Sequence, residues 1–127
     1  MIDRVQWSTG AAAGSAGSAT ATGYSPHVQG EVMAVHVAYL DSPPATTDVT
    51  ISDESDPDGE AIFTSTNNNA DVKKYPRANA HKSGGAAYTY DGTNAVPIPF
   101  VVHGRLKAAI AGANSGDSAT VTVWLKR

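Results

Sequence analysis

The 127-residue chain contains no cysteine, which excludes disulfide bonds, thiolate catalysis and cysteine-ligated zinc. Charge is also scarce, because Asp, Glu, Lys and Arg make up 17% of the residues, below the usual quarter. The formal net charge of -3 produces no field that would attract nucleic acid. A chain of this length fits one domain with a core of its own.

Two kinds of segment are missing as well. No run of about 18 apolar residues occurs, so we expect no membrane-spanning helix and no membrane partner. The opening MIDRVQW lacks the basic stretch and following apolar run of a signal peptide. We therefore expect synthesis in a cytoplasm, followed by residence there or assembly into a larger particle.

Much of the chain carries the period-two alternation that is typical of β-strands. EVMAVHVAYL, residues 31–40, is mostly apolar on both faces and predicts a central strand. Shorter alternating runs occupy residues 48–52, 61–65, 106–110 and 118–126. Proline interrupts residues 72–81 and 96–102, which indicates edge strands. With no convincing amphipathic helix, the sequence predicts an all-β, antiparallel sandwich, and jelly-roll connectivity is one form it could take.

The last two alternating runs flank GANSGD, a segment rich in turn-forming residues. We expect these two runs to pair as an antiparallel hairpin in the core, with Val123 buried. Val123→Asp should then be strongly destabilising, because it would bury an unpaired charge.

The segment before residue 24 has an unusual composition. No Asp, Glu, Lys or Arg occurs between Val5 and Gly30, and residues 9–23 are all Ala, Gly, Ser or Thr. We expect residues 1–23 to form an extended Ala/Gly/Ser-rich N-terminal arm, and residues 24–127 to form the sandwich. Such an arm would order on contact with a partner or act as a tether, with a frayed terminus as the alternative. Deleting residues 1–22 would then leave the sandwich folded.

Groups that could carry catalysis or bind a metal are few. Glu54, Asp56 and Asp58 take the first, third and fifth positions of a calcium loop, but Ser65 stands at the twelfth, where a bidentate Glu is required. A solvated turn is therefore the favoured interpretation. The histidines, none at metal-ligand spacing from another, are His27, His36, His81 and His103. No G-x-S-x-G nucleophile turn occurs either. With no nucleophile, acid pair or metal-ligand set in the sequence, we expect no enzyme activity, no catalytic residue, no metal and no cofactor.

Aromatic residues suggest contact surfaces instead. Tyr88, Tyr90 and Trp124 could line a sugar-binding surface, although packing or a subunit contact is the favoured interpretation. The basic residues around Tyr75 in VKKYPR fit a solvated edge strand better than a nucleic-acid site.

Several features together carry a family resemblance. They are GEV-x-AV-x-V-x-Y, then PATTDVTI, YPR and YDG, and finally GRLK followed by a GD-x-x-TV-x-V ending. Over roughly residues 24–127 the chain resembles small β-sandwich proteins encoded beside the head genes of tailed bacteriophages, which are taken to be capsid decoration, or cement, proteins. No catalytic residues are implied by this resemblance.

The resemblance implies a structural virion protein on the outer surface of a phage capsid, often trimeric, whose partners are the major capsid protein and further copies of itself. The alternative function is a virion-displayed sandwich that binds host-surface glycans. The residues we expect at an interface are Val5, Trp7, Tyr88, Tyr90, Pro97 and Pro99. No nucleic-acid partner is expected.

Overall fold

The computed structural model describes residues 1–127 and contains strands but no helix. The strands are β1 (Ile2–Ser8), β2 (Ala19–Leu40), β3 (Asp48–Asp53), β4 (Ala61–Ser65), β5 (Val72–Lys74), β6 (Ala78–Asn79), β7 (Pro97–Ile98), β8 (Val101–Ala113) and β9 (Ser118–Lys126). All of their pairings are antiparallel, which confirms the predicted all-β antiparallel sandwich. Jelly-roll connectivity is not confirmed. No element is a helix long and apolar enough to cross a membrane.

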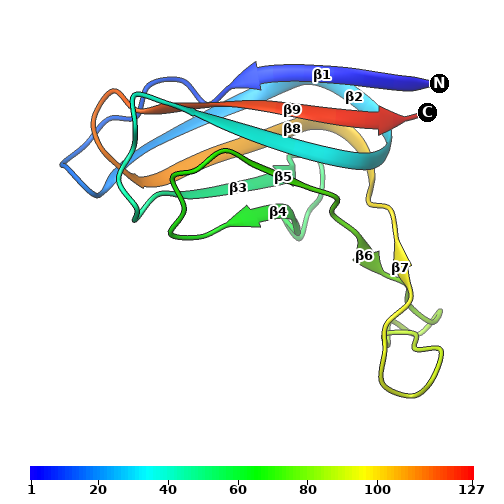
Figure 1. Ribbon diagram of the computed structural model, residues 1–127. Coiled ribbons are helices and arrows are strands. Elements are labelled where there is room, and N and C mark those ends of the chain that lie inside the picture. The colour runs from blue at the N-terminus through cyan, green and yellow to red at the C-terminus, as the bar shows by residue number, and fades with distance from the viewer.

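The sandwich has two layers that share the long strand β2 (Figure 1). Residues 19–31 of β2 pair with β8, whereas residues 31–40 pair with β9. The layer that we call the β9 layer therefore runs β1-β9-β2-β5. The opposite layer, the β8 layer, runs β2-β8-β3-β4.

Gly30 lies where β2 passes from one layer to the other. Its φ of +134° is a conformation that favours glycine, and a Cβ there would lie 2.6 Å from the carbonyl oxygen of Lys126. Register shifts on either side, between Tyr24 and His27 and between Val32 and Ala34, bend the strand further. These irregularities let one strand of 22 residues serve both layers.

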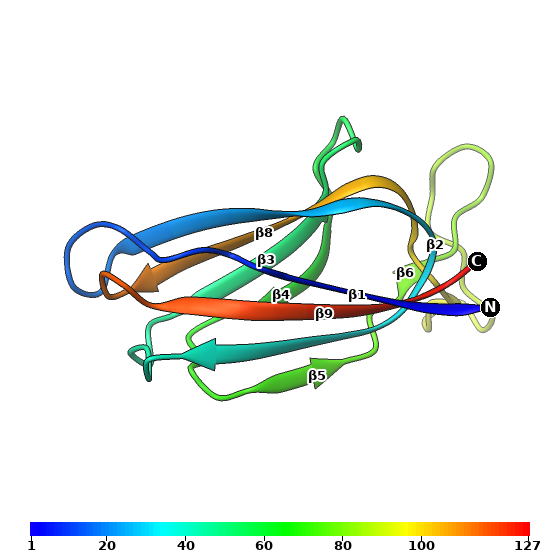
Figure 2. The ribbon, with the colours of Figure 1, turned by 90° about the horizontal axis from the view of Figure 1, so that it is seen from above.

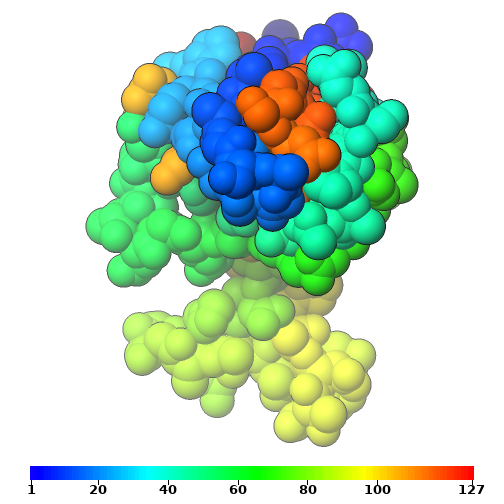
Figure 3. All heavy atoms as spheres, turned by 90° about the vertical axis from the view of Figure 1, so that its left-hand side faces the viewer, coloured from blue at the N-terminus to red at the C-terminus, as the bar shows by residue number.

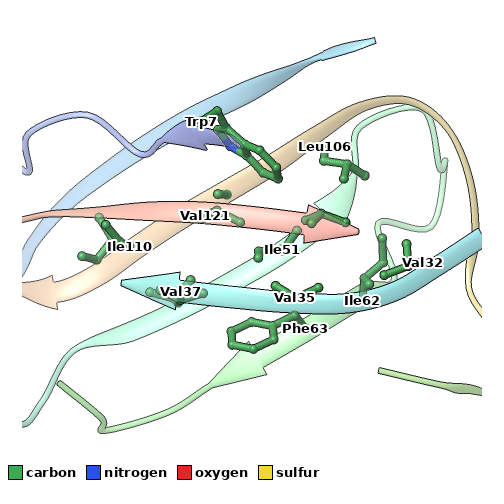
Figure 4. Packing of buried hydrophobic residues seen from close by; sticks show 14 of the residues in the cluster. Trp7, Val32, Val35, Val37, Ile51, Ile62, Phe63, Leu106, Ile110 and Val121 are labelled. Atoms are coloured by element: carbon green, nitrogen blue, oxygen red, sulfur yellow. The ribbon is translucent and has the colours of Figure 1, made fainter. Parts of the chain in front are cut away.

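Apolar side chains of the two layers meet to form one core (Figure 4). Trp7, Val35 and Val121 come from the β9 layer and face Ile51 and Ile110 of the β8 layer. The predicted core position Val123 is only 1% exposed. Alternation along each strand therefore identified the inward positions correctly in this part of the chain.

The expected hairpin between the last two runs is wrong. β8 and β9 are joined by a short turn, but they pair with other strands, and β2 lies between them in the sheet order. The turn carries the chain from the β8 layer to the β9 layer. Alternation shows which residues point inward, but it does not show which strand lies alongside, so the pairing could not be obtained from it.

Residues 1–23 do not form an arm separate from the sandwich. β1 pairs with β9 along its whole length, and Trp7, Ala12 and Ala19 are buried in the core. The expected boundary at residue 23 falls inside β2. Small Ala, Gly, Ser and Thr side chains give little hydrophobic alternation, yet they pack well where strands approach closely. Deleting residues 1–22 would therefore remove a strand and part of the core.

The loop between β1 and β2 is also held in place. The Ala12 N–H donates to the Asp117 carbonyl at 2.7 Å, and the Gly116 N–H donates to the Ala12 carbonyl at 2.8 Å. The Gly17 N–H donates to Oδ1 of Asn114 at 2.9 Å. This loop therefore packs against the turn that joins β8 to β9.

A short strand forms one edge of each layer, β5 in the β9 layer and β4 in the β8 layer. β5 pairs only with β2, and β4 pairs only with β3, which confirms the edge position predicted for the first proline-interrupted segment. Nζ of Lys74 donates to the Thr64 carbonyl at 2.8 Å and lies 5.2 Å from the ring centroid of Phe63. Lys74 thus caps a free acceptor on the β4 edge and covers a core ring.

Candidate interaction site

Residues 78–98, which we call the finger, project from one end of the sandwich (Figures 1 and 3). β6 and β7 pair at its base. Further out, the Ala80 N–H donates to the Val96 carbonyl and the Tyr88 N–H donates to the Ala80 carbonyl, both at 2.8 Å. The finger is therefore a small folded unit of three extended segments, with turns between them.

Asp91 organises the turn nearest the outer part of the finger. Its Oδ1 accepts the N–H groups of Thr93 at 2.9 Å and Asn94 at 2.6 Å, while Oδ2 accepts Nδ2 of Asn94 at 2.6 Å. The backbone hydrogen bond from Asn94, followed by that from Thr93, lowers the pKa of Asp91 below its ordinary value. The finger therefore carries a fixed negative charge at a rigid turn.

The finger has no core of its own. None of its residues is buried, and Tyr88, Tyr90 and Ile98 are 47%, 68% and 41% exposed. It also makes no salt bridge. An isolated hairpin is marginally stable in water at best, because few apolar contacts offset the entropy of ordering its chain. The exposed rings give this element apolar surface that a partner could cover.

The structure divides the predicted interface residues into two groups. Tyr88, Tyr90 and Pro97 lie in the finger, and Pro99 follows its base. Val5 and Trp7 lie instead on β1, and Trp7 is 8% exposed inside the core. Trp7 therefore cannot contact a partner while β1 remains in the sheet, which corrects its expected interface role.

The three aromatic residues considered as an alternative sugar-binding surface lie on two separate elements. Trp124 lies on β9, paired with Arg4 on one side and Ala34 on the other, whereas Tyr88 and Tyr90 lie in the finger.

A lysine lies over the Trp124 ring. Nζ of Lys73 is 4.6 Å from the Trp124 ring centroid and 5.6 Å from the Tyr75 centroid. Cation–π attraction holds the ammonium group in this position. A flat ligand would have to displace it before stacking on the indole. Sequence reasoning missed this contact because β5 and β9 are brought together only through β2.

The acidic loop between β3 and β4 uses its carboxylates locally. Glu54 accepts two hydrogen bonds from Arg105, at 2.6 and 2.8 Å, and this pairing lowers the pKa of Glu54. Asp56 accepts the N–H groups of Asp58 at 3.0 Å and Glu60 at 3.2 Å. No group of three or more His, Asp or Glu side chains is arranged to hold a metal.

Two histidines that are distant in sequence meet on the β8 layer. The ring centroids of His27 and His103 lie 5.0 Å apart in an edge-to-face arrangement. Nearby, Arg105 lies 4.3 Å over the ring of Tyr24. The backbone of His103 is held in place from β3 and the loop that follows it, because its N–H donates to Oδ2 of Asp53 at 3.0 Å and its carbonyl accepts the hydroxyl of Ser55 at 2.8 Å.

The chain matches no protein-family profile. No curated protein sequence matches it either. Among solved structures it is similar to part of a serine protease of Aeromonas sobria, with 8% identity, a TM-score of 0.45, and coverage of 99% of this chain and 27% of the protease.

It is also similar to infectious bursal disease virus VP2 in a subviral particle, with 16% identity, a TM-score of 0.38, and coverage of 98% of this chain and 32% of VP2. A CBM4 structure is similar at 10% identity and a TM-score of 0.31, with 97% of this chain and 90% of the other covered. The chain thus spans about a quarter to a third of the protease and VP2 chains.

Proposed function

We propose that this chain is a structural protein of a bacteriophage virion, which binds the outside of the head through its finger and stabilises the lattice without catalysing a reaction. The observation that carries the proposal is the finger itself. It is an ordered, aromatic, coreless element that projects from a two-layer sandwich (Figure 3). The resemblance to capsid decoration proteins supplies the partner.

A projecting element that is ordered before binding can attach to a partner at a reduced entropic cost. Its turns are preorganised by local hydrogen bonds, such as those of Asp91, so less ordering entropy remains to be lost on binding. Tyr88 and Tyr90 supply the large, rigid side chains that are enriched at protein interfaces. A protein that grips only the assembled shell shifts the equilibrium towards the shell by mass action.

Oligomerisation would strengthen this attachment. We propose a homotrimer, since several fingers on one particle raise the effective concentration of each after the first has bound. Weak single contacts would then hold the protein at many lattice points.

The test uses undecorated heads and the double variant Tyr88→Ser, Tyr90→Ser. The matched control is Leu40→Ser, which removes a 50% exposed apolar side chain from the end of β2, away from the finger (Figure 2). Wild type and the control should sediment with heads, and the double variant should bind at least about tenfold more weakly, as expected when interface tyrosines are removed.

Two results would contradict the proposal. Equal sedimentation of all three proteins would show that the finger is not the binding element. Failure of the wild type to sediment would remove the decoration function, and the glycan-binding alternative would then be tested next with host-cell surface material.

A further inference from the structure

β1 and the first half of β2 diverge from a point of close contact and leave an open wedge between the two layers. At the closed end, Gly23 packs against the end of β1. Towards the other end of β1 a cavity of about 450 Å³ opens. Val5 and Leu125 line it from the β9 layer, and Pro26 and Val28 line it from the β8 layer. The other lining residues are polar or charged, and they are Asp3, Arg4, His27, Gln29 and Arg127, of which Asp3 and Arg127 form a salt bridge. The wedge is thus bordered by the edges of both layers.

β1 presents free hydrogen-bonding groups along this wedge. The Thr9 N–H donates to the Ala119 carbonyl at 3.0 Å, and the Arg127 N–H donates to the Met1 carbonyl at 3.1 Å. In the antiparallel register of β1 and β9, the odd-numbered residues therefore point their N–H and C=O groups towards β9. The backbone groups of the even-numbered residues Ile2, Arg4 and Gln6 point to the open edge.

The β2 side of the wedge is less able to accept a strand. Pro26 has no N–H, and the register of β2 shifts at this point. Edge strands are commonly protected from unwanted pairing by such prolines and irregularities. β1 has neither feature between Ile2 and Ser8. It does carry two charged residues, Asp3 and Arg4, but Asp3 is neutralised by its salt bridge to Arg127, so of the two borders of the wedge β1 is the one that remains competent to pair.

Charge distinguishes between two possible occupants of this edge. The side chain of Arg4 lies on the outer face beside Trp124, and neither salt bridge of the chain includes it. Pairing with β1 of a second copy would place Arg4 opposite Arg4, or, after a shift, opposite Ile2 or Gln6. Like charges directly opposite each other destabilise a strand pair. In the shifted registers the residue opposite Arg4 is uncharged, so the positive charge of Arg4 still lacks a partner.

We infer that the free edge of β1 accepts one extended strand of a different protein chain, with a carboxylate opposite Arg4 and small apolar side chains on its inner face, which would lie between Val5 and Val28 beside the Asp3–Arg127 ion pair. That strand would add to the β9 layer through backbone hydrogen bonds with Ile2, Arg4 and Gln6. Its inner side chains would enter the wedge towards Val28, and the carboxylate would pair with the unpaired guanidinium. This interaction goes beyond the proposed function, which acts through the finger.

The test uses the full-length protein, labelled with nitrogen-15, and the probe acetyl-Thr-Val-Glu-Val-Thr-amide. The control probe carries Lys in place of Glu. We expect saturable shifts of the Ile2, Arg4 and Gln6 amide signals, with a dissociation constant of about 1 mM or below. Those same amides should become protected from hydrogen exchange. The Glu probe should bind about fivefold more tightly than the Lys probe, as expected for a cross-strand charge pair.

A charge swap provides the decisive comparison. Arg4 is exposed, so Arg4→Glu should leave the thermal melting temperature nearly unchanged while inverting the preference towards the Lys probe. Three outcomes would each overturn the inference: no saturation by about 5 mM, shifts centred away from β1 and the wedge, or the same probe preference in both proteins. If neither probe binds while attachment to heads persists, the strand site fails and the finger proposal stands.

Discussion

Gly23 lies directly against the carbonyl group of Ser8, at the closest approach of β2 to the end of β1. A Cβ at position 23 would overlap the Ser8 carbonyl oxygen and lie 2.8 Å from the Cα of Thr9. Both neighbours are backbone atoms, so they cannot rotate away as a flexible side chain would. This contact joins the edges of the two layers and closes one end of the wedge.

Gly23→Ala is therefore expected to destabilise the protein by about 2 kcal/mol or more, because overpacking against backbone forces strands to move. Gly84→Ala is the matched control, since a Cβ there meets no atom within 4 Å. Chemical denaturation of both variants measures the difference. Equal stability of the two would show that β1 and β2 do not pack closely at this point.

Two substitutions of Trp7 should differ widely in how much they lower the free energy of unfolding. Its side chain is buried, but Nε1 has no hydrogen-bond acceptor. Trp7→Ala should lose about 3–5 kcal/mol of unfolding free energy by leaving a cavity. Trp7→Phe should lose only about 1 kcal/mol, because the lost volume is partly offset by removal of an unsatisfied N–H.

Thermal unfolding of both Trp7 variants provides the measurement. If Trp7→Phe proves as costly as Trp7→Ala, the unsatisfied donor contributes nothing. If Trp7→Ala is neutral, the N-terminal segment is not part of the core.

The pH dependence of stability should include a contribution from Asp53. Burial raises the pKa of its carboxyl group. Hydrogen bonds from the His103 N–H and from Ser55 lower the pKa, and together they outweigh burial, so the net pKa lies below its ordinary value. A lowered folded-state pKa means that the stabilisation is present above about pH 4, the pKa of an unfolded Asp. It is lost as the pH falls through the folded-state value.

Asp53→Asn should accordingly be about 1 kcal/mol less stable than wild type at pH 7, and this deficit should shrink towards pH 2. The control is Asp58→Asn, because the Asp58 side chain makes no hydrogen bond or salt bridge. Urea denaturation between pH 2 and 7 decides the matter. A deficit independent of pH would assign the loss to packing instead of ionisation.

Self-association can be measured without heads. We expect sedimentation equilibrium to detect trimers in the micromolar range, as proposed for multivalent attachment to heads. A species that stays monomeric throughout this range would contradict the solution trimer, and would confine any oligomer to the capsid surface.

Local sequence patterns predict much of the architecture. The inward positions of β3, β8 and β9, the edge position of β5 and the turn-rich finger all follow from local patterns. Pairing could not be predicted in the same way. The crossing at Gly30 and the separation of β8 from β9 depend on register between distant segments, and alternation carries no information about register partners.

The candidate site was predictable where its residues are neighbours in sequence. Tyr88, Tyr90 and Pro97 could be grouped because one short segment carries them. The role of Trp7 was misjudged because its strand is short, with few apolar residues, and because it pairs with β9 at the far end of the chain, a partner that no local pattern reveals. The contact of Lys73 with Trp124 joins strands that never pair directly, so no local signal could reveal it.

Cryo-electron microscopy of heads incubated with the full-length protein would show whether it decorates the shell through its finger. We expect sandwich-shaped density on the outer surface of the shell, with the finger between the sandwich and the shell and the rings of Tyr88 and Tyr90 covered by another chain. Heads without added density, or bound protein whose finger points into solvent, would contradict it.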